Sequence, residues 1–78
     1  MYYMITREQP PCVYCKMAKN LADKAGLEYK TFSRDQPEIA EFMDLNGLRS
    51  FPAIFKGSLD MASYLGGHAE FQKHVYSE

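Results

Sequence analysis

The alternation of apolar and polar residues changes its period along the chain, and each change predicts a new element. Residues 2–6 are aromatic and β-prone, so we expect a first strand there, after which Pro10 and Pro11 close a loop. From Cys12 the apolar period becomes helical, and Gly26 is expected to end this first helix. The predicted apolar stripe of the helix consists of Val13, Met17, Leu21 and Ala25, widened by Ala18 and Ala22.

A second strand and a second helix are predicted next. Residues 27–33 alternate between two faces, which is typical of a strand. Asp35 and Glu38 form a potential capping box for the following helix, in which Pro37 is tolerated in the first turn and Gly47 ends the helix. The predicted apolar face of this second helix consists of Ile39, Phe42 and Met43.

The remaining elements give a complete α/β architecture. Residues 52–55 are expected to form a third strand, and a turn at residues 57–58 leads into a weaker fourth strand at about residues 59–62. Residues 66–67 break the chain before a last helix, whose apolar face contains Phe71 and Val75. The order is β-α-β-α-β-β-α. Because the first crossover is expected to be right-handed, its strands are parallel, and the last hairpin adds an antiparallel edge. We therefore expect a mixed four-stranded sheet flanked by three helices.

Composition narrows the class of protein. The chain has 78 residues, which is enough for one domain, and its 46% hydrophobic content is sufficient for a compact core. A net charge of -1 gives no electrostatic reason to expect nucleic acid or an anionic membrane as partner. No segment approaches the roughly 18 apolar residues of a membrane span, and the start lacks the pattern of a signal peptide. We expect a cytoplasmic protein whose thiols are kept reduced.

The two cysteines carry the candidate chemistry. Cys12 is predicted at the N-terminus of a helix, where free backbone N–H groups and the helix dipole stabilise a thiolate. Its pKa should therefore lie below the free value of about 8.5, and Lys16 and Lys19 add positive charge nearby. Cys15 follows at i+3 and shares the same face. We assign Cys12 as the nucleophile and Cys15 as the resolving thiol.

Three other interpretations of the cysteine pair remain open. A permanent structural disulfide between Cys12 and Cys15 would close almost no loop and would be unusual in a reducing compartment. A zinc site would need His68 and His74 as further ligands, but these lie far along the chain from the cysteines, so no metal is expected. Two incidental buried cysteines would be unusual at the start of a helix that follows a strand.

At three places the chain resembles the glutaredoxin family. Cys12-Val13-Tyr14-Cys15 resembles the active-site motif of the family, and its valine is similar to that of phage-encoded glutaredoxins. Residues 49–55 resemble the loop that carries a cis-proline, and Gly66-Gly67-His68 resembles the glycine pair before the last helix. Residues 34–38 and 46–49 are similar to the redoxins that serve ribonucleotide reductase. The resemblance covers nearly the whole chain and implies a single glutaredoxin-like domain over residues 1–78 with a thioredoxin-like fold.

The resemblance also implies a substrate site. A cis bond before Pro52 would place the Phe51 backbone opposite the sulfurs, where it can pair with an extended substrate. In the family, glutathione contacts the positions that correspond here to Tyr14, Phe51, Pro52, Gly67 and His68. Lys16, or Arg7 in the preceding loop, is expected to meet the second carboxylate of glutathione. Ala69 stands where the family commonly has a hydroxyl or carboxylate residue, which removes one hydrogen bond worth about 1 kcal/mol.

The function implied is that of a dithiol glutaredoxin that reduces protein or glutathione mixed disulfides. It would act as a monomer without a permanently bound cofactor, with glutathione as reducing co-substrate and ribonucleotide reductase as one client. Three alternatives stay open: a redoxin reduced by thioredoxin reductase, a carrier of a [2Fe–2S] cluster between two chains, and a zinc-binding module.

Overall fold

The computed structural model describes residues 1–7 and 11–77, so the predicted loop-closing role of Pro10 lies outside the described residues. Its element order confirms the predicted β-α-β-α-β-β-α arrangement, with one additional 3₁₀ turn before the last strand. The elements are β1 (Tyr2–Thr6), α1 (Val13–Lys24), β2 (Tyr29–Ser33), α2 (Pro37–Leu45), β3 (Ala53–Lys56), the 3₁₀ turn η1 (Met61–Ser63), β4 (Tyr64–Gly66) and α3 (His68–Ser77).

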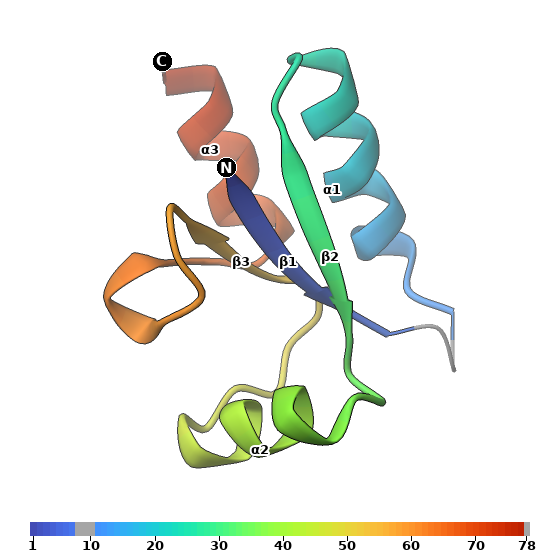
Figure 1. Ribbon diagram of the computed structural model, residues 1–78. Helices are drawn as coiled ribbons and strands as arrows, with labels where there is room; N and C mark the ends of the chain where they lie inside the picture. Colours follow the sequence, from blue (N-terminus) through green and yellow to red (C-terminus); the bar gives the residue numbers. More distant parts are fainter. Residues whose placement is uncertain (8–10, 78) are drawn as a thin grey trace.

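The sheet is mixed, as predicted, with strand order β2-β1-β3-β4. β1 pairs in parallel with β2 and antiparallel with β3, and β3 pairs antiparallel with β4. Helices α1 and α3 lie beside each other on one face of the sheet, and α2 lies on the other (Figure 1). The two central strands are therefore covered on both faces, which explains why they are almost entirely buried.

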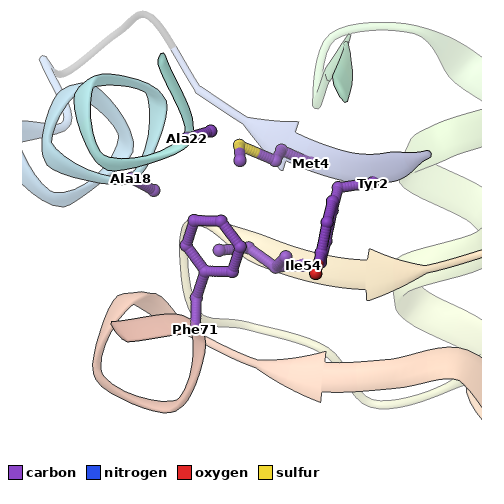
Figure 2. Packing of buried hydrophobic residues seen from close by; sticks show 6 residues of the cluster. All are labelled: Tyr2, Met4, Ala18, Ala22, Ile54 and Phe71. Atoms are coloured by element: carbon purple, nitrogen blue, oxygen red, sulfur yellow. The ribbon is translucent and has the colours of Figure 1, made fainter. Parts of the chain in front are cut away.

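The core consists of two clusters separated by the sheet. Alternate side chains of β1 supply the two clusters: Met4 packs toward α1 and α3, whereas Ile5 packs toward α2. β3 does the same with Ile54 and Phe55. Figure 2 shows the cluster under α1 and α3, whose buried members are Tyr2, Met4, Ala18, Ala22, Ile54 and Phe71.

The buried face of α1 differs from the predicted stripe. Val13 is 66% exposed and Met17 43% exposed, whereas Cys15, Ala18 and Ala22 are buried. The small alanines let α1 approach the sheet closely, and the larger side chains of the sheet and α3 fill the space beneath it (Figure 2). The predicted stripe is confirmed for Ala18 and Ala22, which are buried, and for Leu21, which packs against the core. It was wrong for Val13, Met17 and Ala25, which are exposed, because close packing on the sheet selects the face with the small alanines.

The start of α2 also differs from the prediction. Its N-cap is Gln36 without a side-chain cap, so the predicted capping box of Asp35 and Glu38 is wrong. Ser33 and Gln36 close the turn instead. The backbone N–H of Asp35 donates to Ser33 Oγ at 3.1 Å, and the backbone N–H of Ser33 donates to Gln36 Oε1 at 3.1 Å. The end of α2 follows the prediction, since Gly47 adopts a φ of 67°.

The fourth strand begins later in the chain than predicted. It covers Tyr64–Gly66, whereas residues 59–62 were expected to form it. Asp60 accounts for the shift, because its Oδ1 accepts the backbone N–H of Ser63 at 3.1 Å and caps the 3₁₀ turn η1. The pKa of the Asp60 carboxyl is lowered, first by a hydrogen bond from Ser58, so the cap is held as a carboxylate.

The orientation of α1 can be tested by overpacking. Leu in place of Ala18, which has no exposed surface, should lower the free energy of unfolding by about 1–3 kcal/mol, because the close contact with the sheet must open. Urea unfolding of the oxidised protein, followed by circular dichroism, measures the change.

The matched control is the same substitution at Ala25, which the sequence pattern placed on the same stripe but which is exposed. Ala25→Leu should change the free energy of unfolding by no more than about 0.5 kcal/mol. Equal losses in the two variants would contradict this orientation of α1.

Candidate active site

The register of the sheet brings the candidate motifs to one end of the molecule. Ile5, near the end of β1, pairs with Ala53 at the start of β3, so Thr6 and Arg7 lie near the Phe51-Pro52 peptide. Ile54 pairs with Gly66, which brings the glycine pair to the same end. Three segments distant in sequence, namely the end of β1, the Phe51-Pro52 segment and the glycine pair, therefore meet at this edge.

Cys12 is the N-cap of α1. Its backbone is extended, with φ −112° and ψ 102°, and its Sγ accepts the backbone N–H of Cys15 at 3.2 Å. The two cysteines form a disulfide with their Cα atoms 5.2 Å apart. Both residues are largely buried, with 7% of Cys12 and 3% of Cys15 exposed. The sequence prediction that the pair shares one face at the helix start is confirmed.

The disulfide lies at the wall of a small hollow with a strongly positive lining. We call it the disulfide hollow; its volume is about 300 Å³ and it is lined by Arg7, Pro11, Cys12, Cys15, Lys16 and Lys19. The first turn of α1 contains no acidic residue, so the helix dipole and these three cations act on the sulfurs with the same sign. Arg7, Lys16 and Lys19, the three cations expected near the site, all line this hollow.

Tyr14 and His68 form a second wall beside the cysteines. Tyr14 is 60% exposed, and its ring lies 5.9 Å from the His68 ring, centroid to centroid, at an interplanar angle of 30°. Both rings line a hollow of about 280 Å³ together with Phe51, Ala69 and Glu70. The Nδ1 atom of His68 is buried and has no hydrogen-bond partner among the described residues. Three of the residues predicted to contact glutathione, namely Tyr14, Phe51 and His68, thus lie together in the structure.

The Phe51-Pro52 peptide bond is cis, as predicted. Pro52 is fully buried and is not among the residues that line the two hollows. Phe51 is half-buried, and the Arg7 guanidinium carbon lies 5.5 Å from the centroid of its ring. Arg7 therefore connects the end of β1 to the loop before β3.

The glycine pair is held by a carboxylate of its own chain. The backbone N–H of Gly67 donates to Glu70 Oε1 at 2.7 Å, which satisfies one of the free donors at the start of α3. The Glu70 side chain also covers Gly66, where φ is 128° and a Cβ atom would lie only 2.7 Å from it.

Burial, and secondarily the Glu70 charge, raises the pKa of the Tyr64 hydroxyl above its usual value, so Tyr64 stays neutral.

Comparison with known proteins identifies this arrangement. The family model for glutaredoxins matches residues 1–59. The chain belongs to the glutaredoxin family. Membership of this family, together with the paired cysteines, makes it a thiol–disulfide oxidoreductase with a thioredoxin-like fold. Among curated protein sequences, none matches this glutaredoxin significantly.

Solved glutaredoxin structures extend the likeness to nearly the whole chain. The solution structure of a glutaredoxin from Brucella melitensis is similar with a TM-score of 0.70 and 31% identity, over 97% of this chain and 78% of the other. The buckwheat glutaredoxin–glutathione complex gives a TM-score of 0.71 and 27% identity, over 97% and 69% of the two chains. A mutated buckwheat glutaredoxin gives 0.71 and 26%, with the same coverage.

The histidines of the zinc alternative do not join the cysteines. Tyr2 Oη and His74 Nε2 are hydrogen-bonded at 3.0 Å, so His74 belongs to the core edge, and His68 lies against Tyr14. In the part of this glutaredoxin that the structure describes, no group of three or more His, Cys, Asp or Glu side chains is placed to hold a metal ion. Within the same residues, no helix has the length and apolar character needed to cross a membrane.

Two residues near the site had no functional role in the sequence analysis. Arg34 and Arg49 line a hollow with Arg7 and Phe51, although they are distant in sequence from both cysteines. The backbone N–H of Arg34 donates to the carbonyl of Thr6 at 2.9 Å, which fixes Arg34 next to the end of β1. No local sequence pattern indicates that Arg34 and Arg49 lie close to Arg7, because their positions depend on the pairing of β1 with β2 and on the course of the loop before β3.

The Glu70 contact gives a stability prediction for this glutaredoxin. Glu70→Ala removes the acceptor for the Gly67 N–H, so the free energy of unfolding should fall by about 0.5–2 kcal/mol in urea titrations. Glu41→Ala, at an exposed position in α2, is the control and should cost less than about 0.5 kcal/mol. If both variants unfold at the same urea concentration, Glu70 does not cap α3.

Proposed function

We propose that Cys12 is the nucleophile and Cys15 the resolving thiol of this thiol–disulfide oxidoreductase. The observation that carries the assignment is the hydrogen bond from the backbone N–H of Cys15 to Cys12 Sγ, at the N-cap of α1. In the reduced protein the same N–H is placed to donate to a Cys12 thiolate, and a charge-assisted bond of this kind is stronger than a neutral one. Cys15 lies inside the first turn and lacks the N-cap position.

The surrounding charges support the same assignment. Arg7, Lys16 and Lys19 line the hollow that contains both sulfurs, and that lining contains no carboxylate among its described residues. A positive environment at a helix N-terminus stabilises a thiolate and lowers its pKa below the free value of about 8.5. Cys12 would then be substantially ionised near neutral pH and able to attack a disulfide.

The reaction is a two-step exchange. The Cys12 thiolate attacks one sulfur of the substrate disulfide, forms a mixed disulfide and releases the other substrate sulfur as a thiolate, which takes up a proton. Cys15, after losing its proton, attacks Cys12 Sγ and releases the second substrate sulfur as a thiol. Two electrons pass to the substrate, and the Cys12–Cys15 disulfide, the form present in the structure, is the oxidised product.

We further propose glutathione as the reducing co-substrate and disulfides of proteins or glutathione as the substrates. The hollow between Tyr14, Phe51 and His68 lies next to the cysteine motif and has apolar rings for a small peptide to cover. Lys16 supplies a cation for a carboxylate in the adjoining hollow, and Gly67 and Pro52 complete the proposed contacts through their backbones. A structural relative from buckwheat is a glutaredoxin–glutathione complex, which is consistent with this choice.

One observation favours a second reductant, a flavoenzyme of the thioredoxin reductase type. The Gly67 N–H, expected to receive a carboxylate of glutathione, already donates to Glu70 at 2.7 Å. Glutathione would have to displace this carboxylate or use the neighbouring N–H groups of α3. Ala69 offers no side-chain hydrogen bond in compensation.

The proposed setting of the reaction is the cytoplasm, with the chain acting as a monomeric single domain. Ribonucleotide reductase is the proposed client, because residues 34–38 and 46–49 are similar to the redoxins that serve that enzyme. The Cys12–Cys15 pair would supply the dithiol for reducing such a client.

The roles of the two cysteines can be separated by matched substitutions. Cys12→Ser should abolish reduction of a glutathione–peptide mixed disulfide, because no nucleophile remains at the helix start. Cys15→Ser should keep the first step and accumulate a covalent adduct on Cys12, visible by intact-protein mass spectrometry. The chain contains only these two cysteines, so the adduct can be assigned without ambiguity. Undiminished turnover by Cys12→Ser would overturn the assignment.

The reductant is decided by coupled assays at equal NADPH flux. We expect faster turnover with glutathione and glutathione reductase than with thioredoxin reductase, since the Tyr14 hollow lies beside the sulfurs. Faster turnover with thioredoxin reductase would instead establish the second candidate. The Cys12→Ser protein is the blank for both assays.

A further inference from the structure

A third hollow lies between Arg7 and α2, and arginine dominates its lining. We call it the arginine hollow; its volume is about 400 Å³ and it is lined by Arg7, Arg34, Met43, Asp44, Leu48, Arg49 and Phe51. Arg34 and Arg49 are exposed, and Asp44 is the only carboxylate among the described lining residues. Met43, Leu48 and Phe51 form the apolar part of the wall.

Arg7 lines both the arginine hollow and the disulfide hollow, so the two hollows adjoin at its side chain. Its guanidinium lies 5.5 Å from the Phe51 ring, and its buried Nε atom has no hydrogen-bond partner among the described residues. The guanidinium of Arg7 is therefore oriented by the Phe51 ring at a position that both hollows share.

The two hollows form one strongly positive surface on a chain that is slightly acidic overall. The five cations that line the hollows define what we call the basic surface: Arg7, Lys16, Lys19, Arg34 and Arg49. The whole chain has only 9 Lys and Arg residues and a net charge of -1. More than half of its basic residues thus line these two hollows, which is a concentration that a general solubility requirement does not explain.

We propose that the basic surface binds an acidic segment of the polypeptide substrate, next in sequence to the disulfide that Cys12 reduces. The inference rests on the proposed function and names the class of substrate for it. Carboxylates are the complementary groups for guanidinium side chains, which hold them in paired hydrogen bonds. Since Arg34 directly follows β2 and Arg49 lies in the loop before β3, these two arginines come from segments other than the one that carries the cysteines.

The extent of the surface favours a polypeptide over a small anion. The ligand must reach from the disulfide hollow past Arg7 into the arginine hollow, and an extended chain covers roughly 3.3 Å per residue. A segment with acidic residues on one side of the reacting cysteine would occupy both hollows at once. The exposed arginines would also attract such a segment at a distance and increase its association rate.

The test mixes pre-reduced protein with substrate for a single turnover. The Cys12–Cys15 dithiol supplies both electrons, so no reductase or glutathione is added. Two peptides carry the same disulfide, flanked by aspartates in one and by asparagines in the other. The wild-type protein should reduce the aspartate peptide about tenfold faster at low ionic strength, and this preference should fade as ionic strength rises from about 0.05 M to about 0.5 M.

Charge reversal then locates the binding site. The double variant Arg34→Glu/Arg49→Glu should bring the ratio of the two peptide rates close to one, and the asparagine peptide reports any general loss caused by misfolding. Lys73→Glu, an equal change per residue on exposed α3, should leave the ratio as in the wild type. Oxidised glutathione is the third substrate, because its carboxylates offer the same chemistry in a small molecule.

The outcomes separate the inference from the proposed function. Equal rates for the two peptides, or an equal loss in Lys73→Glu, would overturn the inference while leaving the chemistry intact. An effect of Arg34→Glu/Arg49→Glu on oxidised glutathione alone would also overturn it, since the surface would then serve only the small molecule. Failure of the wild type to reduce any of the three substrates would instead disprove the proposed function.

Discussion

The antiparallel pairing of β1 with β3 is the constraint on which the site depends. It sets the end of β1 beside the start of β3, so Arg7 and the cis peptide before Pro52 lie at the same edge of the sheet. β4 pairs with β3 and brings the start of α3 to that edge as well. A slip of one residue in this register would exchange the two faces of β1 and dismantle both core clusters.

The packing of α1 links this core to the chemistry. Because the helix rests on Ala18 and Ala22, Cys15 turns inward and the neighbouring Tyr14 turns outward. Close packing thus buries Cys15, while the ring of the neighbouring Tyr14 remains exposed. The same rotation leaves Val13 and Met17 at the surface next to the cysteine motif, where apolar area is available to a substrate instead of to the core.

Charge is distributed unevenly around the site in a way that follows from the fold. The positive groups that line the two hollows come from Arg7 after β1, from α1 and from the segments after β2 and before β3, whereas the carboxylate of Glu70 lies at the start of α3. The surface on the α2 side is therefore basic and exposed. At the start of α3, by contrast, the Gly67 N–H is already hydrogen-bonded to the Glu70 carboxylate. This asymmetry favours substrates that approach with their negative charge on the α2 side.

The sequence by itself determined the order of elements, the helix N-terminus under Cys12, the proline before β3 and the glycines before α3. These features follow from local periodicity and from residues with special backbone requirements, such as Gly47 and Gly66. Tertiary structure alone decided which face of α1 is buried, because small and large apolar residues compete and only packing density selects between them. It also decided the late start of β4, the turn before α2, and the meeting of Arg7 with Arg34 and Arg49, since contacts between residues so far apart depend on strand register and leave no local trace in the sequence.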